Sequence, residues 1–138
     1  MDNQTLRVLL TKSFIDSHDR AIKTVAAALR DAAMEVVLID YETPQDVIDV
    51  AIDEDVDVVG LSFMSGGQVD VTTQVVEGLR AKGAHDVPVV VGGTIRPFDV
   101  DPLVAVGVAA IFRGGETLAS IAETFARFAA QRKSRIDD

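Results

Sequence analysis

The sequence contains no cysteine, and this absence excludes several kinds of site. The chain can form no structural disulfide, carries no thiolate nucleophile and has no cysteine-based zinc site. Long hydrophobic runs are also missing, so no segment has the length that a membrane-spanning helix needs. The first residues show no basic segment followed by a long apolar one, so we expect no signal peptide. We therefore predict a cytoplasmic protein without a membrane partner.

Basic residues are in the minority, with 13 Lys and Arg against 22 Asp and Glu and a net charge of −9. An acidic surface repels the phosphates of nucleic acids, so we expect no nucleic-acid partner. A basic cluster near the C-terminus is interpreted as a solvated helix end: Arg127, Arg132, Lys133 and Arg135. An acidic cluster is interpreted in the same way rather than as a metal site: Asp53, Glu54, Asp55 and Asp57.

The remaining composition is that of an ordinary globular domain, with 138 residues of which 48% are hydrophobic. We predict one domain over residues 1–138, with its core at about 6–130. Residues 131–138 are expected to form a polar tail that frays.

Five short apolar runs predict strands, at residues 6–10, 36–39, 56–61, 87–91 and 109–112. Each run is continuous rather than alternating, as in parallel strands with both faces covered. Segments of helical period follow the runs. Thr43-Pro44 and Asp101-Pro102 predict the starts of two of these helices, Gly83 predicts the end of another, and Thr117 precedes the last.

The alternation of strands and helices predicts a single α/β domain of the flavodoxin-like, Rossmann-like kind. Its five-stranded parallel sheet would have the order 2-1-3-4-5, with helices on both faces. In such sheets ligands bind beyond the carboxyl ends of the strands. The segments expected there are rich in small and polar residues: 12–21, 62–67, 92–94 and 113–117.

Asp16 and His18 form a carboxylate–imidazole pair in the first of these segments. A carboxylate two residues from a histidine can accept its second N–H, which fixes the tautomer and makes the other nitrogen a better ligand. A glycine pair, Gly92-Gly93, follows another predicted strand and removes side chains where a ligand must approach the backbone.

Taken together, these residues resemble the cobalamin-binding domain of the methylmalonyl-CoA mutase family and its separate small subunits. The family signature is Asp-x-His-x-x-Gly, then Ser-x-Leu, then Gly-Gly. The matching residues are Asp16-Ser17-His18-Asp19-Arg20-Ala21, Ser62-Phe63-Met64 and Gly92-Gly93. The resemblance covers the chain from about Leu6 to Phe125.

The resemblance implies that His18 is the axial ligand of cobalt, in place of the dimethylbenzimidazole of the cofactor, which is thus bound base-off. Asp16 would hold His18, and Lys12 would hydrogen-bond to Asp16. Ser62 would meet the displaced nucleotide tail, and Gly92 and Gly93 would leave room for it. The full set of cofactor-binding residues expected is Lys12, Asp16, Ser17, His18, Asp19, Arg20, Ala21, Ser62, Met64, Ser65, Gly66, Gly92, Gly93, Thr94, Gly114 and Gly115.

The chain departs from the family pattern at several positions. Ala21 stands where the family has glycine, Met64 replaces leucine, and Phe14 occupies a position that is usually small. The segment 113–117 is an expanded form of a Pro-Gly-Thr turn. These departures bear on cofactor affinity and leave His18 in place. His85, expected on the opposite edge, is interpreted as a surface residue.

By resemblance, the function is that of the small subunit of an adenosylcobalamin-dependent acyl-CoA mutase, an isomerase that works by radical chemistry. The chain has no room for the domain that holds the acyl-CoA, so a large partner subunit is expected in a hetero-oligomer, and this chain alone should be inactive. Which acyl-CoA is used stays open. A corrinoid carrier for methyl transfer and a scaffold that has lost its cofactor are the alternatives. A signal receiver domain is rejected, because Ser62 stands where the phosphoacceptor aspartate would be.

Overall fold

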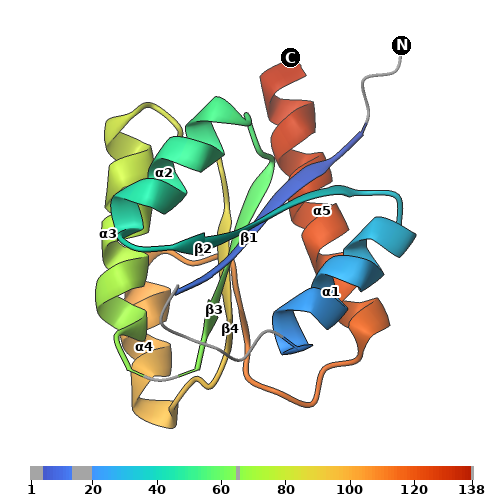
Figure 1. Cartoon of the computed structure of the whole chain (residues 1–138). Helices are drawn as coiled ribbons and strands as arrows, with labels where there is room; N and C mark the ends of the chain where they lie inside the picture. Colours follow the sequence, from blue (N-terminus) through green and yellow to red (C-terminus); the bar gives the residue numbers. More distant parts are fainter. Residues whose placement is uncertain (1–4, 14–19, 65, 138) are drawn as a thin grey trace.

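The computed structural model describes residues 5–13, 20–64 and 66–137 and forms one twisted sheet between two layers of helices (Figure 1). The strands are β1 (Arg7–Ser13), β2 (Glu35–Tyr41), β3 (Val58–Phe63), β4 (Val89–Gly93) and β5 (Ala110–Phe112). The helices are α1 (Arg20–Asp31), α2 (Pro44–Asp53), α3 (Gln68–Ala81), α4 (Pro97–Val106) and α5 (Leu118–Asp137). None of the described helices is long and apolar enough to cross a membrane.

The sheet has the order β2-β1-β3-β4-β5 with every pair parallel, which confirms the predicted topology. Helices α2, α3 and α4 cover one face, and α1 and α5 cover the other (Figure 1). Each face has its own apolar core. Leu9, Val59 and Leu79 belong to the core under α2–α4, and Leu10, Ala26 and Phe125 belong to the core under α1 and α5. Alternate residues of β1 therefore face opposite layers, as the strand period requires.

Four strands reach further toward their carboxyl ends than their apolar runs predict, and among them β2 continues to Tyr41 rather than ending at Ile39. β1 continues to Ser13, so Lys12 lies in a strand and not in the loop after it. Ser62 and Gly92 are paired in the β3–β4 ladder, and Gly93 is paired with Phe63. Hydropathy misses these positions because the ladder is held by backbone groups, so small or polar residues extend a strand wherever a neighbour is present to pair.

Three of the four helix boundaries predicted from capping and turn residues are found in the structure. Asp46 accepts a hydrogen bond from the Thr43 backbone at 3.1 Å, and the Thr117 hydroxyl accepts one from the Ser120 backbone at 3.0 Å. Gly83 follows α3 with φ +80°, in the left-handed region that glycine adopts freely.

The predicted start at Asp101-Pro102 is wrong. α4 begins five residues earlier at Pro97, after Arg96 in an extended conformation, and Pro102 lies inside the helix. Proline is favoured at the first position of a helix, and both Pro97 and Pro102 meet that preference. The position at which β4 ends determines that the helix begins at Pro97.

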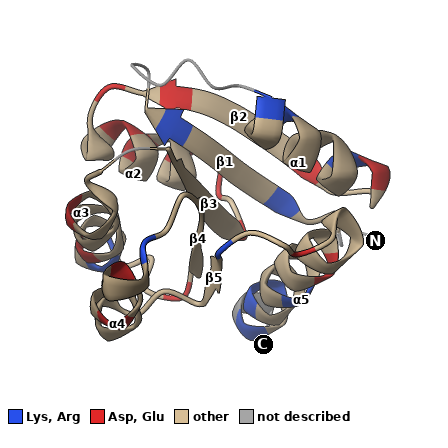
Figure 2. Cartoon of the chain, turned by 90° about the horizontal axis from the view of Figure 1, so that it is seen from below, with Lys and Arg blue, Asp and Glu red and all other residues tan. Residues whose placement is uncertain are grey.

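The polar end, for which we expect fraying, belongs for the most part to a helix, because α5 continues to Asp137. Arg132 is buried and donates to Asp57 at 2.9 Å, Asp86 at 3.0 Å and Asp55 at 3.3 Å. Asp57 is fully buried and also accepts from the Arg7 backbone at 2.9 Å. The acidic and basic clusters therefore include a buried ion-pair network in addition to solvated side chains. Figure 2, which looks onto the carboxyl ends of the strands, shows basic residues on α5 near its C-terminal end.

The network changes the titration of Arg132. Burial lowers the pKa of Arg132, but its hydrogen bonds with Asp57 and Asp86 outweigh that effect, so the pKa lies above the ordinary arginine value. The guanidinium is thus held in its charged form at one edge of the sheet, opposite the edge where a ligand is expected.

Candidate functional site

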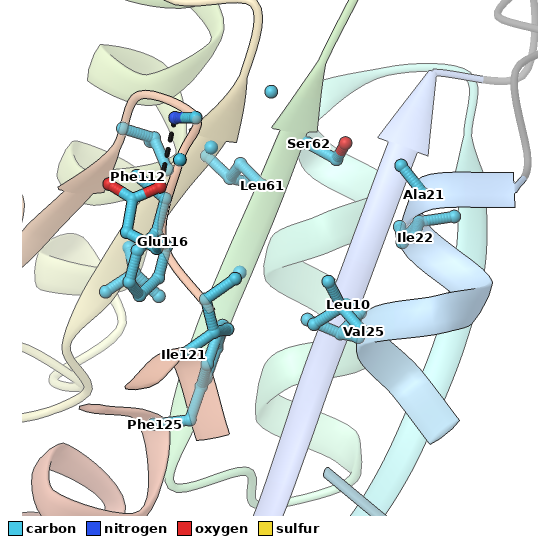
Figure 3. Close-up of a pocket in the computed structure, with 17 residues that line it drawn as sticks. Leu10, Ala21, Ile22, Val25, Leu61, Ser62, Phe112, Glu116, Ile121 and Phe125 are labelled. Carbon is cyan, nitrogen blue, oxygen red and sulfur yellow. Dashed lines mark hydrogen bonds between the residues drawn. The ribbon is translucent and has the colours of Figure 1, made fainter. Parts of the chain in front are cut away.

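A cavity of about 210 Å³ opens at the carboxyl edge of the sheet, between the strands and helices α1 and α5 (Figure 3). Ala21, Ile22 and Val25 line it from α1, and Ile121 and Phe125 line it from α5. Its other walls come from the strands and the segment after β5: Leu10, Gly60, Leu61, Ser62, Val90, Val91, Gly92, Gly93, Phe112, Gly114, Gly115 and Glu116. The cavity is therefore an apolar slot with few polar groups, as expected of a small-molecule site.

Two glycines keep this slot wide. A Cβ added to Gly60 would lie 2.8 Å from Leu10 Cδ2 and 3.0 Å from Phe125 Cζ. A Cβ added to Gly92 would lie 3.3 Å from Phe112 Cβ. Phe112 itself stacks on Phe125, with 5.9 Å between ring centroids, so neither ring can easily give way. Side chains at these two positions would therefore narrow the cavity.

Gly93 has a different role from Gly92. Its φ of +102° lies in the left-handed region, and an added Cβ would collide with the carbonyl oxygen of Phe63. The chain turns here, and the Thr94 N–H donates to that same carbonyl at 2.7 Å. Gly93 is thus needed for the turn itself, while Gly92 is needed for the space beside it.

Ser62 and Glu116 are the polar side chains of the lining. The half-buried Ser62 hydroxyl makes no hydrogen bond to any other described residue, so it can donate to or accept from a ligand. The Glu116 carboxylate accepts from the backbone N–H groups of Arg113 at 3.1 Å and Gly114 at 3.0 Å, and thus closes the turn after β5. Figure 3 draws the bond from Gly114 as a dashed line. Gly114 and Gly115 both have positive φ in this turn.

Sequence reasoning did not single out Glu116 as a site residue. Its place in the expanded turn 113–117 was the available signal, because a carboxylate two or three residues after free backbone N–H groups can cap them.

Lys12 lies at the end of β1 with only 3% of its surface exposed. Its Nζ lies 3.4 Å from Asp40 Oδ1 of β2 and donates to the Ser13 carbonyl at 3.5 Å. Asp40 is a second residue that the sequence analysis did not single out, and the pairing of Lys12 with Asp40 in the β1–β2 register explains the contact. A buried ammonium needs such oxygen partners. Lys12 is therefore a fixed positive group at the carboxyl edge.

The predicted site residues divide into three groups. Those that line the cavity are Ala21, Ser62, Gly92, Gly93, Gly114 and Gly115. Those at the same edge but outside the cavity lining are Lys12, Arg20, Met64, Gly66 and Thr94. Those that lie outside the described residues are Asp16, Ser17, His18, Asp19 and Ser65, together with Phe14. The expected contacts of Lys12 with Asp16 and of Asp16 with His18 therefore stay predictions.

The cavity fits the nucleotide tail of a cobalamin better than it fits the whole cofactor. An apolar cavity of about 150 Å³ holds a benzene molecule, so 210 Å³ accommodates a flat aromatic heterocycle. Leu10, Ile22 and Phe125 would cover its faces, and Ser62 offers a hydrogen bond at the mouth. The corrin ring is far too large for this volume and would lie outside, against the carboxyl edge.

Other features of the described chain do not compete for this role. No group of three or more His, Asp or Glu among the described residues could hold a metal ion. A second cavity of about 390 Å³ lies at the amino ends of β4 and β5, and it contains none of the predicted cofactor-binding residues. His85 lines that second cavity and is exposed, in agreement with its interpretation as a surface residue.

Solved structures agree with the fold. One is a cobalamin-binding protein from Desulfitobacterium hafniense DCB-2, with a TM-score of 0.75 and 19% identity over 91% of this chain and 60% of that one. A receiver domain of the response regulator NarL from Mycobacterium tuberculosis has a TM-score of 0.69 and 19% identity over 91% of this chain and 97% of that one. Identities this low establish the architecture alone.

Curated sequences are much more similar. The chain is 43% identical over 109 residues to the 2-hydroxyisobutanoyl-CoA mutase small subunit of Aquincola tertiaricarbonis, covering 78% of this chain and 80% of that protein. It is 39% identical over 135 residues to the pivalyl-CoA mutase small subunit of Xanthobacter autotrophicus, covering 96% and 90%. The methylmalonyl-CoA mutase of Cereibacter sphaeroides is 38% identical over 118 residues, which are 85% of this chain but only 17% of that protein.

The family model for the B12 binding domain matches residues 6–122, which include all five strands and every cavity-lining residue except Phe125. The fold, the slot at the carboxyl edge and this match agree, and the chain belongs to the B12-binding domain family.

Proposed function

We propose that this chain is the cobalamin-binding small subunit of an acyl-CoA mutase, that its cofactor is adenosylcobalamin and that it acts in the cytoplasm. One observation carries the proposal. A chain that matches mutase small subunits over most of their length has, at the carboxyl edge of its sheet, an apolar slot of the size of an aromatic base. When bound, the cofactor supplies the radical chemistry of the rearrangement, and the protein supplies binding, orientation and exclusion of water.

The chain's own residues divide this work. His18 is the proposed axial ligand of cobalt, with Asp16 fixing its tautomer and Lys12 placing a positive charge next to Asp16. Gly60 and Gly92 leave room for the base, and Ser62 donates or accepts a hydrogen bond at the mouth of the slot. Phe112 and Phe125 exclude water from one side of the base.

The acyl-CoA has to be held by another chain. The described residues form a single sheet whose cavity at this edge, at about 210 Å³, is too small for both a cofactor base and a coenzyme A ester. The methylmalonyl-CoA mutase of Cereibacter sphaeroides is about six times longer than its matched segment, since 118 residues are 17% of that protein. We therefore propose a large partner subunit that holds the acyl-CoA, and a small subunit that is inactive alone.

A titration of the purified chain with adenosylcobalamin, followed by absorbance, tests the proposal. We expect the wild type to give the spectrum of a histidine-ligated, base-off corrinoid, and His18→Ala to lose that spectrum. His85→Ala is the matched control, because the chain has only two histidines and His85 is exposed at the opposite edge. Equal spectra and affinities for wild type and His18→Ala would disprove the axial-ligand role.

The two alternatives predict different results in the same assay. A corrinoid carrier for methyl transfer would bind methylcobalamin and pass its methyl group to an acceptor protein, without a requirement for a mutase large subunit. A scaffold without cofactor would bind no cobalamin even when the large subunit is present. The similarity to two acyl-CoA mutase small subunits over at least 78% of this chain favours the mutase.

A further inference from the structure

Exposed large hydrophobic side chains are unevenly placed on the described surface. Three of them lie at the carboxyl edge, where the cavity opens: Met64, Phe98 and Leu118, which are 37%, 69% and 43% exposed. The other two lie near the C-terminal ends of α2 and α4, at the opposite edge: Ile52 at 41% and Val104 at 60%. Phe98 is the most exposed of all five, and it is the only aromatic one.

Phe98 is held in place although it is exposed. It lies in the first turn of α4, and the Arg96 guanidinium lies over its ring at 4.8 Å from the centroid. The Arg96 side chain is itself held by a hydrogen bond, in which its Nε donates to Asp99 Oδ2 at 3.2 Å. The Asp99 side chain is buried, with only 8% of its surface exposed. The three residues form a clamp: a buried carboxylate orients a guanidinium, which in turn orients an exposed ring.

The segment that carries this clamp is also anchored to the core. The Thr94 N–H donates to the Phe63 carbonyl at 2.7 Å, and the Gln68 side chain donates to the Thr94 carbonyl at 2.8 Å. Gln68 and Ile95 are both buried, with 2% and 7% of their surfaces exposed. The ring of Phe98 is therefore presented on a rigid base, so little conformational entropy remains to be lost when a partner covers it.

The position of Phe98 indicates the partner. The slot is too small for a corrin ring. Under the proposed function, the reacting part of the cofactor would therefore lie outside the slot and against the carboxyl edge. The chain that holds the acyl-CoA has to reach the cofactor there. Phe98 is exposed at the same edge, in the first turn of α4 and shortly after the end of β4 at Gly93.

We propose that the Arg96–Phe98 clamp is a binding hot spot for the large subunit, and this inference rests on the proposed function. Aromatic and arginine side chains dominate the binding energy of protein interfaces when they are pre-positioned and become fully covered. Phe98 inserts into an apolar pocket of the partner, and Arg96 acts as the residue that positions the ring. Met64 and Leu118 extend the apolar part of the same edge.

The test uses the cobalamin-loaded chain and the large mutase subunit of the same organism, with their association measured by isothermal titration calorimetry. We expect Phe98→Ala to weaken association by about 10- to 100-fold. Val104→Ala is the matched control, because it is another exposed apolar residue on the same helix at the other edge, and it should change association by less than about twofold. Cobalamin affinity of the isolated chain should be unchanged in both variants.

A double-mutant cycle tests the role of Arg96. Arg96→Ala should weaken association by about 3- to 10-fold in the wild-type background and much less in Phe98→Ala, because Arg96 acts through the ring. Equal effects in both backgrounds would overturn the positioning role.

The failures of the two proposals are distinguishable. If the wild-type chain binds cobalamin and the large subunit, and Phe98→Ala associates as well as Val104→Ala, the hot spot is disproved and the proposed function stands. A loss of cobalamin affinity in isolated Phe98→Ala would assign the ring to the cofactor and overturn the interface. A wild-type chain that binds neither would overturn both proposals.

Discussion

Arg132 and Asp57 are 75 residues apart in the chain, and the guanidinium of the first donates to the carboxylate of the second at 2.9 Å. Both side chains are almost fully buried, at 9% and 0% exposure. Lys133 lies 3.3 Å from the other oxygen of Asp57, to which the Arg7 backbone N–H also donates. This contact joins the end of α5 to the segment before β3 and holds the amino edge of the sheet while the carboxyl edge carries the site.

Arg132→Met should destabilise the fold by about 3 to 5 kcal/mol, because it leaves the Asp57 carboxylate buried without its main partner. Urea unfolding followed by circular dichroism measures the loss. Arg127→Met is the control. The exposed Arg127 side chain makes no hydrogen bond or ion pair with another described residue, and its guanidinium lies 5.2 Å from the centroid of the Phe128 ring, so its loss should cost less than about 1 kcal/mol. Equal losses in the two variants would contradict the structural role of the network.

The stability difference between wild type and Arg132→Met should be constant from about pH 7 to about pH 10. Burial lowers the pKa of Arg132 in the folded chain, but the hydrogen bonds with Asp57 and Asp86 outweigh burial and raise the pKa above the ordinary arginine value. A group whose pKa is higher in the folded chain contributes its full stabilisation at every pH below its pKa in the unfolded chain. That stabilisation is lost only as the pH rises through its pKa in the folded chain. Urea unfolding at several pH values checks this, and a difference that shrinks within that range would show that another group controls it.

Gly92→Ala and Gly93→Ala should differ, although the residues are neighbours. The methyl of Gly92→Ala enters the slot at 3.3 Å from Phe112, so the variant should fold but bind adenosylcobalamin about tenfold more weakly. Gly93→Ala should lose about 2 kcal/mol or more of folding stability, because φ is +102° and the methyl meets the Phe63 backbone. Gly83→Ala is the control for an added methyl away from the slot, since Gly83 lies at the opposite edge and no atom lies within 4 Å of its added Cβ. The same binding loss in Gly83→Ala would refute the steric explanation.

Ser62→Ala should weaken adenosylcobalamin binding by about 2- to 10-fold, the effect of one lost hydrogen bond of about 0.5–1.5 kcal/mol. Folding stability should hardly change, because the hydroxyl bonds to no other described residue. The absorbance titration measures the affinity, and Ser120→Ala, on an exposed position of α5, is the control. Unchanged affinity in Ser62→Ala would remove this residue from the site.

Some of the site could be read from residue spacing. Ser62, Gly92 and Gly93 stand at the ends of apolar runs, and parallel strands bring their carboxyl ends to one edge, so these residues had to meet once the topology was known. Asp40 could not be found this way, because it acquires its role from a contact with Lys12 on the neighbouring strand, which spacing along the chain does not specify.

The sequence by itself determined the class of fold, the strand order and the edge that carries the site, because hydrophobic periodicity and turn residues are local signals with few consistent topologies. Only the tertiary structure decided that α4 begins at Pro97, that Phe98 is left exposed under Arg96, and that Arg132 is buried against Asp57. Each of these depends on which distant groups become neighbours. A charged or aromatic side chain has the same local pattern whether it is solvated or paired, and packing alone makes the difference.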